Sequence, residues 1–284
     1  MLNKLFVHTR RRLEKLLANT GDMALKRRAR RIIEELAPED GDKILDVGCG
    51  DGYYLYLLSN LGLRLKLIGA DFNEKALVSA SRNLRGKKIK LVKADLMRGL
   101  PFDPESFDKV VMSEVVEHLP NDVKGLTEVK RTLKKGGTLV LTVPNHNYPL
   151  LWDPVNWALE HLFRTHISRG FWSGIWNQHL RLYYPEEIEN VSEKAGFKVG
   201  YRESLTWWCL PFNHNLVNLV ARNLYGGRLP HELRASIDKF QDPSKKPFLI
   251  SLAFKLVNTI DRLNDLYNPK SSGVGVLVKA YKAR

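Results

Sequence analysis

A glycine-rich turn is the feature that most constrains how this 284-residue chain can fold. Residues 44–52 read ILDVGCGDG, in which a short apolar run with the character of a buried strand leads into the turn. Glycines at Gly48, Gly50 and Gly52 let the backbone turn tightly and approach a ligand before a helix begins. A dinucleotide-binding G-x-G-x-x-G turn would have its third glycine where this chain has Tyr53. The turn therefore predicts a ligand-binding α/β fold of another kind.

Short apolar runs alternate with helical stretches through the middle of the chain, which predicts a parallel sheet with right-handed helical crossovers. Five runs have the length of strands: 43–47, 66–70, 88–92, 107–112 and 138–143. A helix is expected over 185–196, a strand near 197–203 and a last strand over 273–281. We therefore predict a doubly wound α/β fold.

A carboxylate stands at the end of each of the first three predicted strands. Asp46 precedes the glycine turn and suits a ligand with an ammonium group, whereas Asp71 can accept the hydroxyls of a ribose. The ring of Phe72 could cover an adenine, and Asp95 could accept its amino group. Since the carboxyl ends of parallel strands share one edge of a sheet, we expect a single ligand crevice there. The alternative for each acid is a capping or turn residue.

Five segments occur in a fixed order: ILDVGCGDG, GADFNEKAL, KADL, FDKVVMSEVVEHL and LKKGGTLVLTVPN. With them the chain resembles the class I S-adenosylmethionine-dependent methyltransferase family, and most closely its small-molecule and ubiquinone-type O-methyltransferase branch. The resemblance covers residues 43–144 closely and 179–196 more loosely. It implies a Rossmann-like, seven-stranded sheet of order 3-2-1-4-5-7-6 with an antiparallel last strand, and S-adenosyl-L-methionine as cofactor.

The resemblance also implies that eight residues near the strand ends bind this cofactor: Asp46, Gly48, Gly50, Asp71, Phe72, Asp95, Leu96 and Ser113. The first three would meet its methionine part, Asp71 the ribose, and Asp95 with Leu96 the adenine. Ser113 would border the sulfonium.

The candidate catalytic residues follow the fourth predicted strand, in the array Glu114-x-x-Glu117-His118. Methyl transfer is an in-line displacement, and an oxygen acceptor must also lose its proton to a base. We identify His118, Glu114 and the more distant His179 as catalytic candidates, with structural hydrogen bonding or packing as the alternative. Glu114, Glu117 and His118 could hold a divalent ion. Because relatives with an E-H pair work without a metal, we expect no bound metal.

The organisation of the chain favours a lipophilic acceptor. Residues 1–42 form basic helices, 43–205 plus 271–284 the methyltransferase domain, and the insertions 145–184 and 206–270 a cap. These insertions are rich in Trp, Tyr, Phe and Leu and could roof the site for a lipid, quinone or glycan-lipid acceptor. The aromatic residues could instead form the core of the cap.

Three segments suggest work at a membrane surface without crossing it: 2–17, 206–224 and 248–267 carry apolar stripes at helical spacing. Residues 1–31 hold ten Lys and Arg against Glu14 and Asp22, a charge that anionic lipid attracts. Such stripes also commonly pack inside a protein. With only two cysteines and no secretory signal, we expect a cytoplasmic protein, with attachment to the inner face of the membrane as a further hypothesis.

Two other functions compete with this interpretation. An RNA methyltransferase would fit the net charge of +14, although no recognised RNA-binding module is present. The chain also lacks the Asn/Asp-Pro-Pro-aromatic run that enzymes methylating base nitrogens carry after the fourth strand. A non-catalytic cofactor-binding partner subunit is the other candidate, and the complete set of motifs argues against it.

Overall fold

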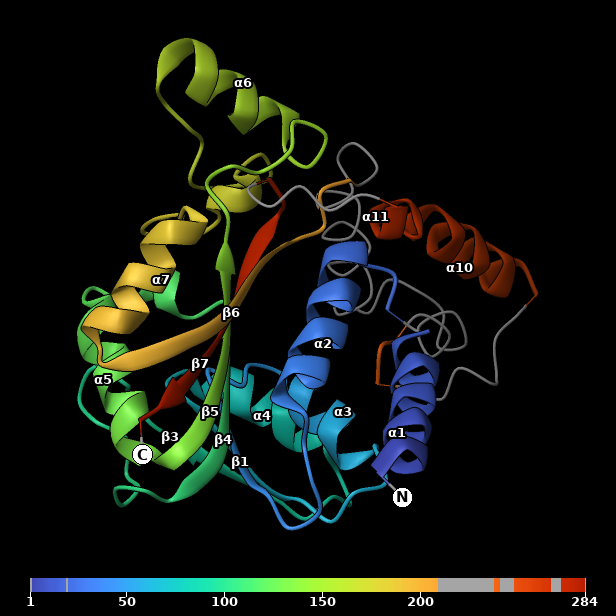
Figure 1. The fold of residues 1–284 in the computed structure, drawn as a ribbon. Coiled ribbons are helices and arrows are strands. Elements are labelled where there is room, and N and C mark those ends of the chain that lie inside the picture. The colour runs from blue at the N-terminus through green and yellow to red at the C-terminus, as the bar shows by residue number, and fades with distance from the viewer. Residues whose placement is uncertain (1, 19, 209–237, 241–247, 267–271, 284) are drawn as a thin grey trace.

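Seven strands form one mixed sheet in the order β3-β2-β1-β4-β5-β7-β6. This computed structural model describes residues 2–18, 20–208, 238–240, 248–266 and 272–283 (Figure 1). Strands β1 to β5 run parallel, and β7 pairs antiparallel with both β5 and β6. The doubly wound fold, the strand order and the antiparallel last strand expected from the sequence are therefore confirmed. The strands are β1 (Lys43–Val47), β2 (Lys66–Asp71), β3 (Ile89–Lys93), β4 (Phe107–Ser113), β5 (Leu133–Pro144), β6 (Phe197–Leu205) and β7 (Gly275–Lys282).

Alternating side chains of the strands fill a core on each face of the sheet. In β5, Leu139 and Leu141 lie in one core and Val140 in the other, as the two-residue period of a strand requires. Helices α5 and α7 cover the first face, and α1, α2 and α3 cover the second (Figure 1). The described helices are α1 (Leu2–Leu17), α2 (Met23–Leu36), α3 (Tyr53–Ser59), α4 (Glu74–Asn83), α5 (Asp122–Thr132), α6 (Pro154–Phe163), α7 (Pro185–Lys194), α10 (Phe248–Asp261) and α11 (Leu263–Leu266), with 3-10 turns η1 (Val116–His118) and η2 (Gly174–Trp176).

The N-terminal helices belong to the core of the domain. Asp22 caps α2 by accepting hydrogen bonds from the backbone N–H groups of Ala24 and Leu25. Leu13 and Leu17 of α1 are buried in the same core as the inner face of α2. This part of the stripe expected to meet a membrane is therefore used for internal packing, the commoner use of an amphipathic helix.

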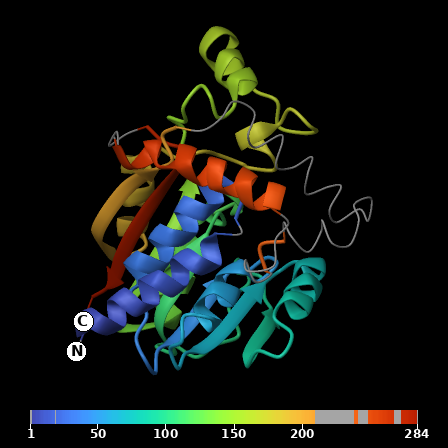
Figure 2. The same cartoon turned by 90° about the vertical axis from the view of Figure 1, so that its right-hand side faces the viewer.

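The aromatic insertion forms a third apolar cluster beyond the ends of the strands. Tyr148, Trp152 and Trp176 pack there against Met23 of α2 and Val274 near β7. Several aromatic residues of the insertion therefore make a small core, the alternative weighed above. Helix α6 does not join the sheet and stands away from the rest of the molecule in two perpendicular views (Figures 1 and 2).

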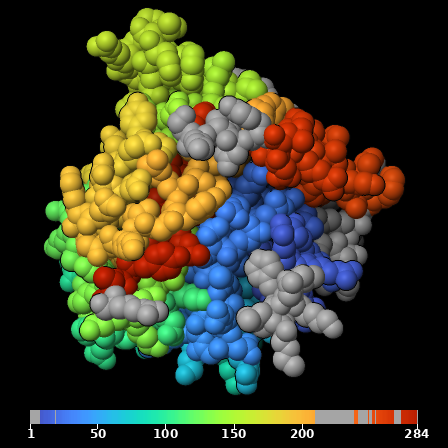
Figure 3. Space-filling model, in the orientation of Figure 1, coloured from blue at the N-terminus to red at the C-terminus, as the bar shows by residue number. Residues whose placement is uncertain are grey.

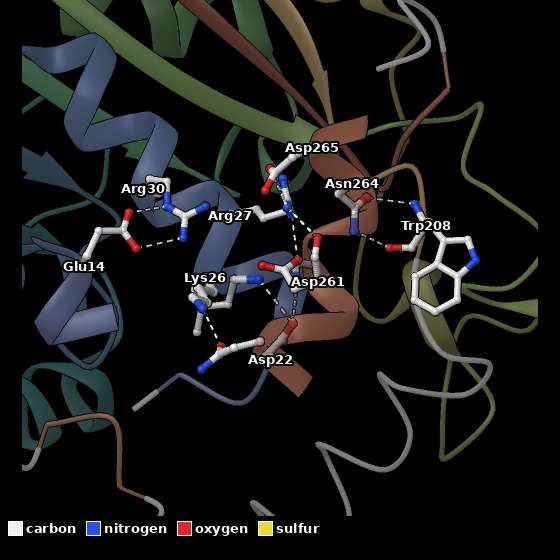
Figure 4. Close-up of polar contacts among 12 residues, drawn as sticks. Glu14, Asp22, Lys26, Arg27, Arg30, Trp208, Asp261, Asn264 and Asp265 are labelled. Atoms are coloured by element: carbon white, nitrogen blue, oxygen red, sulfur yellow. Dashed lines mark hydrogen bonds and ion pairs between the residues drawn. The ribbon is translucent and has the colours of Figure 1, made fainter. Parts of the chain in front are cut away.

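Charged groups tie the C-terminal helices α10 and α11 to the outer side of α2. The guanidinium of Arg27 donates to Asp261 Oδ1 at 2.6 Å and to Asp265 Oδ1 at 2.8 Å (Figure 4). Asn264 exchanges two hydrogen bonds with the backbone of Trp208. Most of the predicted stripe 206–224 lies outside the described residues. No described helix is both long and apolar enough to cross a membrane.

Candidate active site

The carboxyl ends of β1 and β2 are joined through the glycine turn. The backbone N–H groups of Gly48 and Cys49 donate to the carbonyl of Ala70 at 2.8 and 3.1 Å. The N–H of Gly50 donates to Asp71 Oδ2 at 2.8 Å. Asp71 is buried, and each of its oxygens keeps a lone pair for a further donor. Its carboxylate thus holds the turn in place while facing the edge of the sheet.

The turn after β1 also contacts the segment that follows β4. Gly48 has φ +71°, and a Cβ atom at this position would clash with Cγ2 of Val115. Only glycine combines this left-handed conformation with so close an approach. The contact brings the ends of β1 and β4 together.

Asp46 is the most unusual carboxyl of the site. It lies at the end of β1 with only 1% of its surface exposed, and its Oδ2 has no hydrogen-bond partner among the described residues. Burial raises the pKa of Asp46 to about 8, and the nearby charges of Asp71 and Asp51 raise it further. A buried carboxyl without a partner is unfavourable, and a ligand cation would compensate it.

The residues that follow β2 and β3 are open to solvent. Phe72 exposes 72% of its surface beside Asp71, so its ring is accessible to a flat ligand. Asp95 is exposed and accepts a hydrogen bond from the N–H of Met97. The side chain of Leu96 is buried in the core below, which leaves its backbone for any ligand contact.

Three hydroxyl groups meet at the end of β4. Ser113 Oγ lies 2.9 Å from the hydroxyl of Tyr54 and 2.8 Å from Thr142 Oγ1 on β5. Tyr54 belongs to α3, directly after the glycine turn. The hydroxyls therefore connect the ends of β4 and β5 to the turn.

Arg28 joins the site from α2, a residue that the sequence analysis did not single out. Its Nη1 lies 2.7 Å from Glu114 Oε2. The Nε of Arg28 and the Oε1 of Glu114 are buried, and neither has a hydrogen-bond partner within the described part of the chain. Glu114 holds φ 54°, a conformation that a non-glycine residue adopts rarely and mostly at functional sites. No sequence pattern distinguishes Arg28 from the basic residues around it.

Glu117, His118 and His179 form a compact group beside this pair. The Nε2 atoms of His118 and His179 lie 3.7 and 3.8 Å from Glu117 Oε1. Glu117 is fully buried, and its oxygens have no hydrogen-bond partner in the described segments. The Nδ1 of His118 is 3.0 Å from the carbonyl of Gln178, which can only accept, so this nitrogen donates the hydrogen bond.

Burial sets the charges in this group. It raises the pKa of Glu117 well above its usual range, and the neighbouring Glu114 adds to the effect. Burial also lowers the pKa of His179, which keeps the imidazole neutral and able to accept a proton.

The ligating atoms of Glu117, His118 and His179 lie within 4.8 Å of one another, so these three side chains could surround a metal ion. The group differs from the set considered from the sequence. Glu114 is held by Arg28 and His179 takes its place.

A separate cavity of about 260 Å³ lies on the outer side of α2. Arg27, Arg30 and Arg31 line it, and each is already paired with a carboxylate of the protein. None of the residues predicted for the site borders this cavity. It is therefore distinct from the strand ends where the predicted site residues lie.

Comparisons with known proteins identify a family for the segment from β1 to β5. Residues 45–141 match the family described as "Methyltransferase domain". A demethylmenaquinone methyltransferase from Staphylococcus aureus is 31% identical over 180 residues, which cover 59% of this chain and 73% of that protein.

Two solved structures share the fold. Phosphoethanolamine N-methyltransferase 2 from Haemonchus contortus, in complex with S-adenosyl-L-methionine, has a TM-score of 0.53 at 18% identity, covering 90% of this chain and 52% of that chain. The [4+2]-cyclase SpnF has a TM-score of 0.55 at 16% identity, covering 90% of this chain and 80% of that chain. Because a cyclase shares the fold, the fold alone does not define the reaction.

The raised pKa of Asp46 predicts a pH-dependent stability. Folding keeps a proton on this carboxyl, with a pKa of about 8, that the unfolded chain releases near the ordinary value of 3.8. Between these pH values the folded state binds more protons than the unfolded state. As the pH rises through this range, the free energy of unfolding therefore falls by about 1.4 kcal/mol per pH unit because of this group alone. Asp46→Asn removes that loss.

We expect urea unfolding of the ligand-free protein to show an advantage of Asp46→Asn over the wild type that grows from about pH 5 to about pH 8 and then levels off. Asp103→Asn, at an exposed carboxyl, is the matched control and should follow the wild type. Parallel pH profiles for Asp46→Asn and the wild type would contradict the assignment.

Proposed function

Because this chain belongs to the S-adenosylmethionine-dependent methyltransferases, we propose that it methylates a lipophilic acceptor with an ionisable hydroxyl group, such as a reduced quinone, a lipid or a glycan-lipid. The observation that carries the proposal is the group of buried Glu117, partly buried His179 and exposed His118, which follows the contact between Val115 and the glycine turn. The similarity to a demethylmenaquinone methyltransferase favours a quinone-type acceptor.

The strand ends offer a partner for each charged group of the cofactor's methionine part. Asp46, buried and without a partner among the described residues, suits the ammonium group. The turn at Gly48 and Gly50 allows the backbone to approach the ligand closely. The guanidinium of Arg28, with its unused buried Nε, suits the carboxylate.

The nucleoside part has its own set of residues. The carboxylate of Asp71 would accept hydrogen bonds from the ribose hydroxyls. The exposed ring of Phe72 would cover the adenine. Asp95 would accept the adenine amino group beside the backbone of Leu96. Ser113, fixed by Tyr54, would border the sulfonium.

The bound cofactor supplies a methyl group on a positively charged sulfur. The chain must then align the acceptor oxygen with that methyl group and remove the oxygen's proton. His179 is the candidate base because burial lowers its pKa and keeps it neutral. Glu117, whose Oε1 lies 3.7 and 3.8 Å from the Nε2 atoms of the two histidines, would help to position them. Glu114 orients Arg28 and so links the acceptor side to the cofactor side.

We place the enzyme in the cytoplasm, at the inner face of an anionic membrane that would hold such an acceptor. The net charge of +14 supports this placement, since anionic lipids attract basic surfaces.

The acceptor class is tested by product extraction. The protein is incubated with S-adenosylmethionine labelled in the methyl group and with a cell extract divided into lipid and RNA fractions. We expect label in the solvent-extractable lipid fraction, and none without protein. Label that enters only the RNA fraction would contradict the proposed acceptor while leaving the methyltransferase activity intact.

The role of Arg28 is tested with two ligands. S-Adenosylhomocysteine carries the amino-acid end, and 5′-methylthioadenosine lacks it. We expect Arg28→Met to weaken the binding of S-adenosylhomocysteine by about 30-fold, because one charge-assisted hydrogen-bond pair is lost. The binding of 5′-methylthioadenosine should weaken by less than about twofold. Asp71→Ala is the matched control and should weaken both, since both carry the ribose. Calorimetric titration that finds equal losses for the two ligands in Arg28→Met would refute a carboxylate contact.

The role of His179 as the base is tested with the acceptor that the product extraction identifies. We expect His179→Ala to lower kcat/KM by about 100-fold or more, whereas His8→Ala on α1 should be neutral. The activity of the wild type should rise as the pH increases through the pKa of His179, because the base must be unprotonated. Burial lowers this pKa below the ordinary value of 6.5. The pH profile of His179→Ala should lack this rise.

Chelation separates a base from a metal site. The wild type should keep its activity in EDTA if His179 acts as a simple base. Loss of activity that Mg²⁺ or Zn²⁺ restores would overturn this role and assign an ion to Glu117, His118 and His179.

A further inference from the structure

We propose that residues 154–172, called the knob here, dock the protein onto an anionic lipid bilayer. The knob consists of α6 and the loop that follows it. It stands at the top of the molecule in Figures 1 and 2, and as a protrusion in the space-filling view of Figure 3. The proposal rests on the proposed function in one respect, namely that the bilayer is the source of the lipophilic acceptor.

The base of the knob is firmly held. Asn156 is fully buried, and its amide donates to Asp153 Oδ2 and to the carbonyls of Trp172 and Ser173. Its Oδ1 accepts from the N–H of Ile167. These hydrogen bonds join the start of α6 to the returning loop, so the position of the knob is fixed by buried contacts.

The knob exposes large apolar side chains at the end of α6 and on its returning loop. Leu162 and Phe163, the last residues of α6, have 72% and 69% of their surfaces exposed. Phe171 and Trp172 on the returning loop are each nearly half exposed, with their rings edge to face. Adjacent exposed apolar residues mark an interaction surface, and tryptophan is favoured at the boundary between lipid and water.

The charge of the knob complements an anionic surface. Glu160 is its only acidic residue, and both oxygens are occupied, by the hydroxyl of Tyr148 at 2.5 Å and by Nε1 of Trp176 at 2.6 Å. Arg164 and Arg169 are exposed on the knob, and neither forms an ion pair with a described residue. Phosphate groups of lipids are the matching partners for two such guanidinium groups.

The knob is continuous with the acceptor side of the site. From its returning loop the chain runs through η2 to His179, which contacts Glu117. Leu180, next to this histidine, exposes 60% of its surface. A bilayer at the knob would therefore lie on the side from which an acceptor reaches the candidate base.

A second apolar surface competes with the knob. Helices α10 and α11 expose Leu252, Leu256 and Leu266. This surface exposes the basic residues Lys255 and Arg262, but it also presents Asp265, whose side chain is 57% exposed. The knob exposes its two arginines and no carboxylate, and an exposed carboxylate opposes contact with anionic lipid. The charge therefore favours the knob, and the two surfaces can be separated by mutation.

The test is sedimentation of the full chain with vesicles of phosphatidylcholine, alone or mixed with phosphatidylglycerol. We expect binding to the mixed vesicles at low salt, weakening as salt rises. Leu162→Ser with Phe163→Ser, and separately Arg164→Gln with Arg169→Gln, should each lower the vesicle partition coefficient by about tenfold or more. Leu252→Ser with Leu256→Ser is the matched control on α10 and should bind like the wild type.

Three results would overturn the proposal: a wild type that stays in the supernatant with mixed vesicles at low salt, equal binding to neutral vesicles, or a loss of binding confined to the α10 control. Titration of every variant with S-adenosylhomocysteine verifies folding, because none of these residues lies at the strand ends. A wild type that binds vesicles but not this ligand would refute the proposed function and leave the docking surface standing.

Discussion

The close contact between the glycine turn after β1 and the segment after β4 is the constraint on which the candidate site depends. Gly48 lies against Val115 in a conformation and at a distance that no side chain permits. Asp46 lies buried at the end of β1 directly before this turn, and Glu114 and Glu117 follow the end of the neighbouring strand β4. A side chain at Gly48 would push the two strand ends apart, and with them the cofactor and acceptor sides of the proposed site.

Buried polar groups without partners give this edge of the sheet its chemical character. Asp46, Glu117 and the Arg28–Glu114 pair all keep buried atoms that no described residue satisfies. On the outer side of the same α2 helix, Arg27 is paired with both Asp261 and Asp265. Unsatisfied buried groups lower stability and persist mainly where a ligand or a reaction uses them. Their concentration at one edge is what distinguishes the site from the well-paired surface around it.

The aromatic insertion shows how far composition alone can be interpreted. Its tryptophans and tyrosines predicted either a lid over the site or a small core. The structure divides them: Trp152 and Trp176 are buried in the third cluster, whereas Phe163 and Trp172 are exposed on α6 and the loop that follows it. Residue type gives the tendency to be buried, but the position of each side chain relative to the packed elements decides whether it is.

The sequence by itself determined the order of strands and helices, the glycine turn and the acids at the strand ends. These features follow from local periodicity and backbone conformation, which a short window of residues specifies. Only the tertiary structure decided that Arg28 reaches Glu114, that His179 meets His118 across 60 residues of chain, and that Leu13 and Leu17 face the core instead of a membrane. Contacts between residues distant in sequence depend on how whole helices and strands pack together, and no local pattern encodes that arrangement.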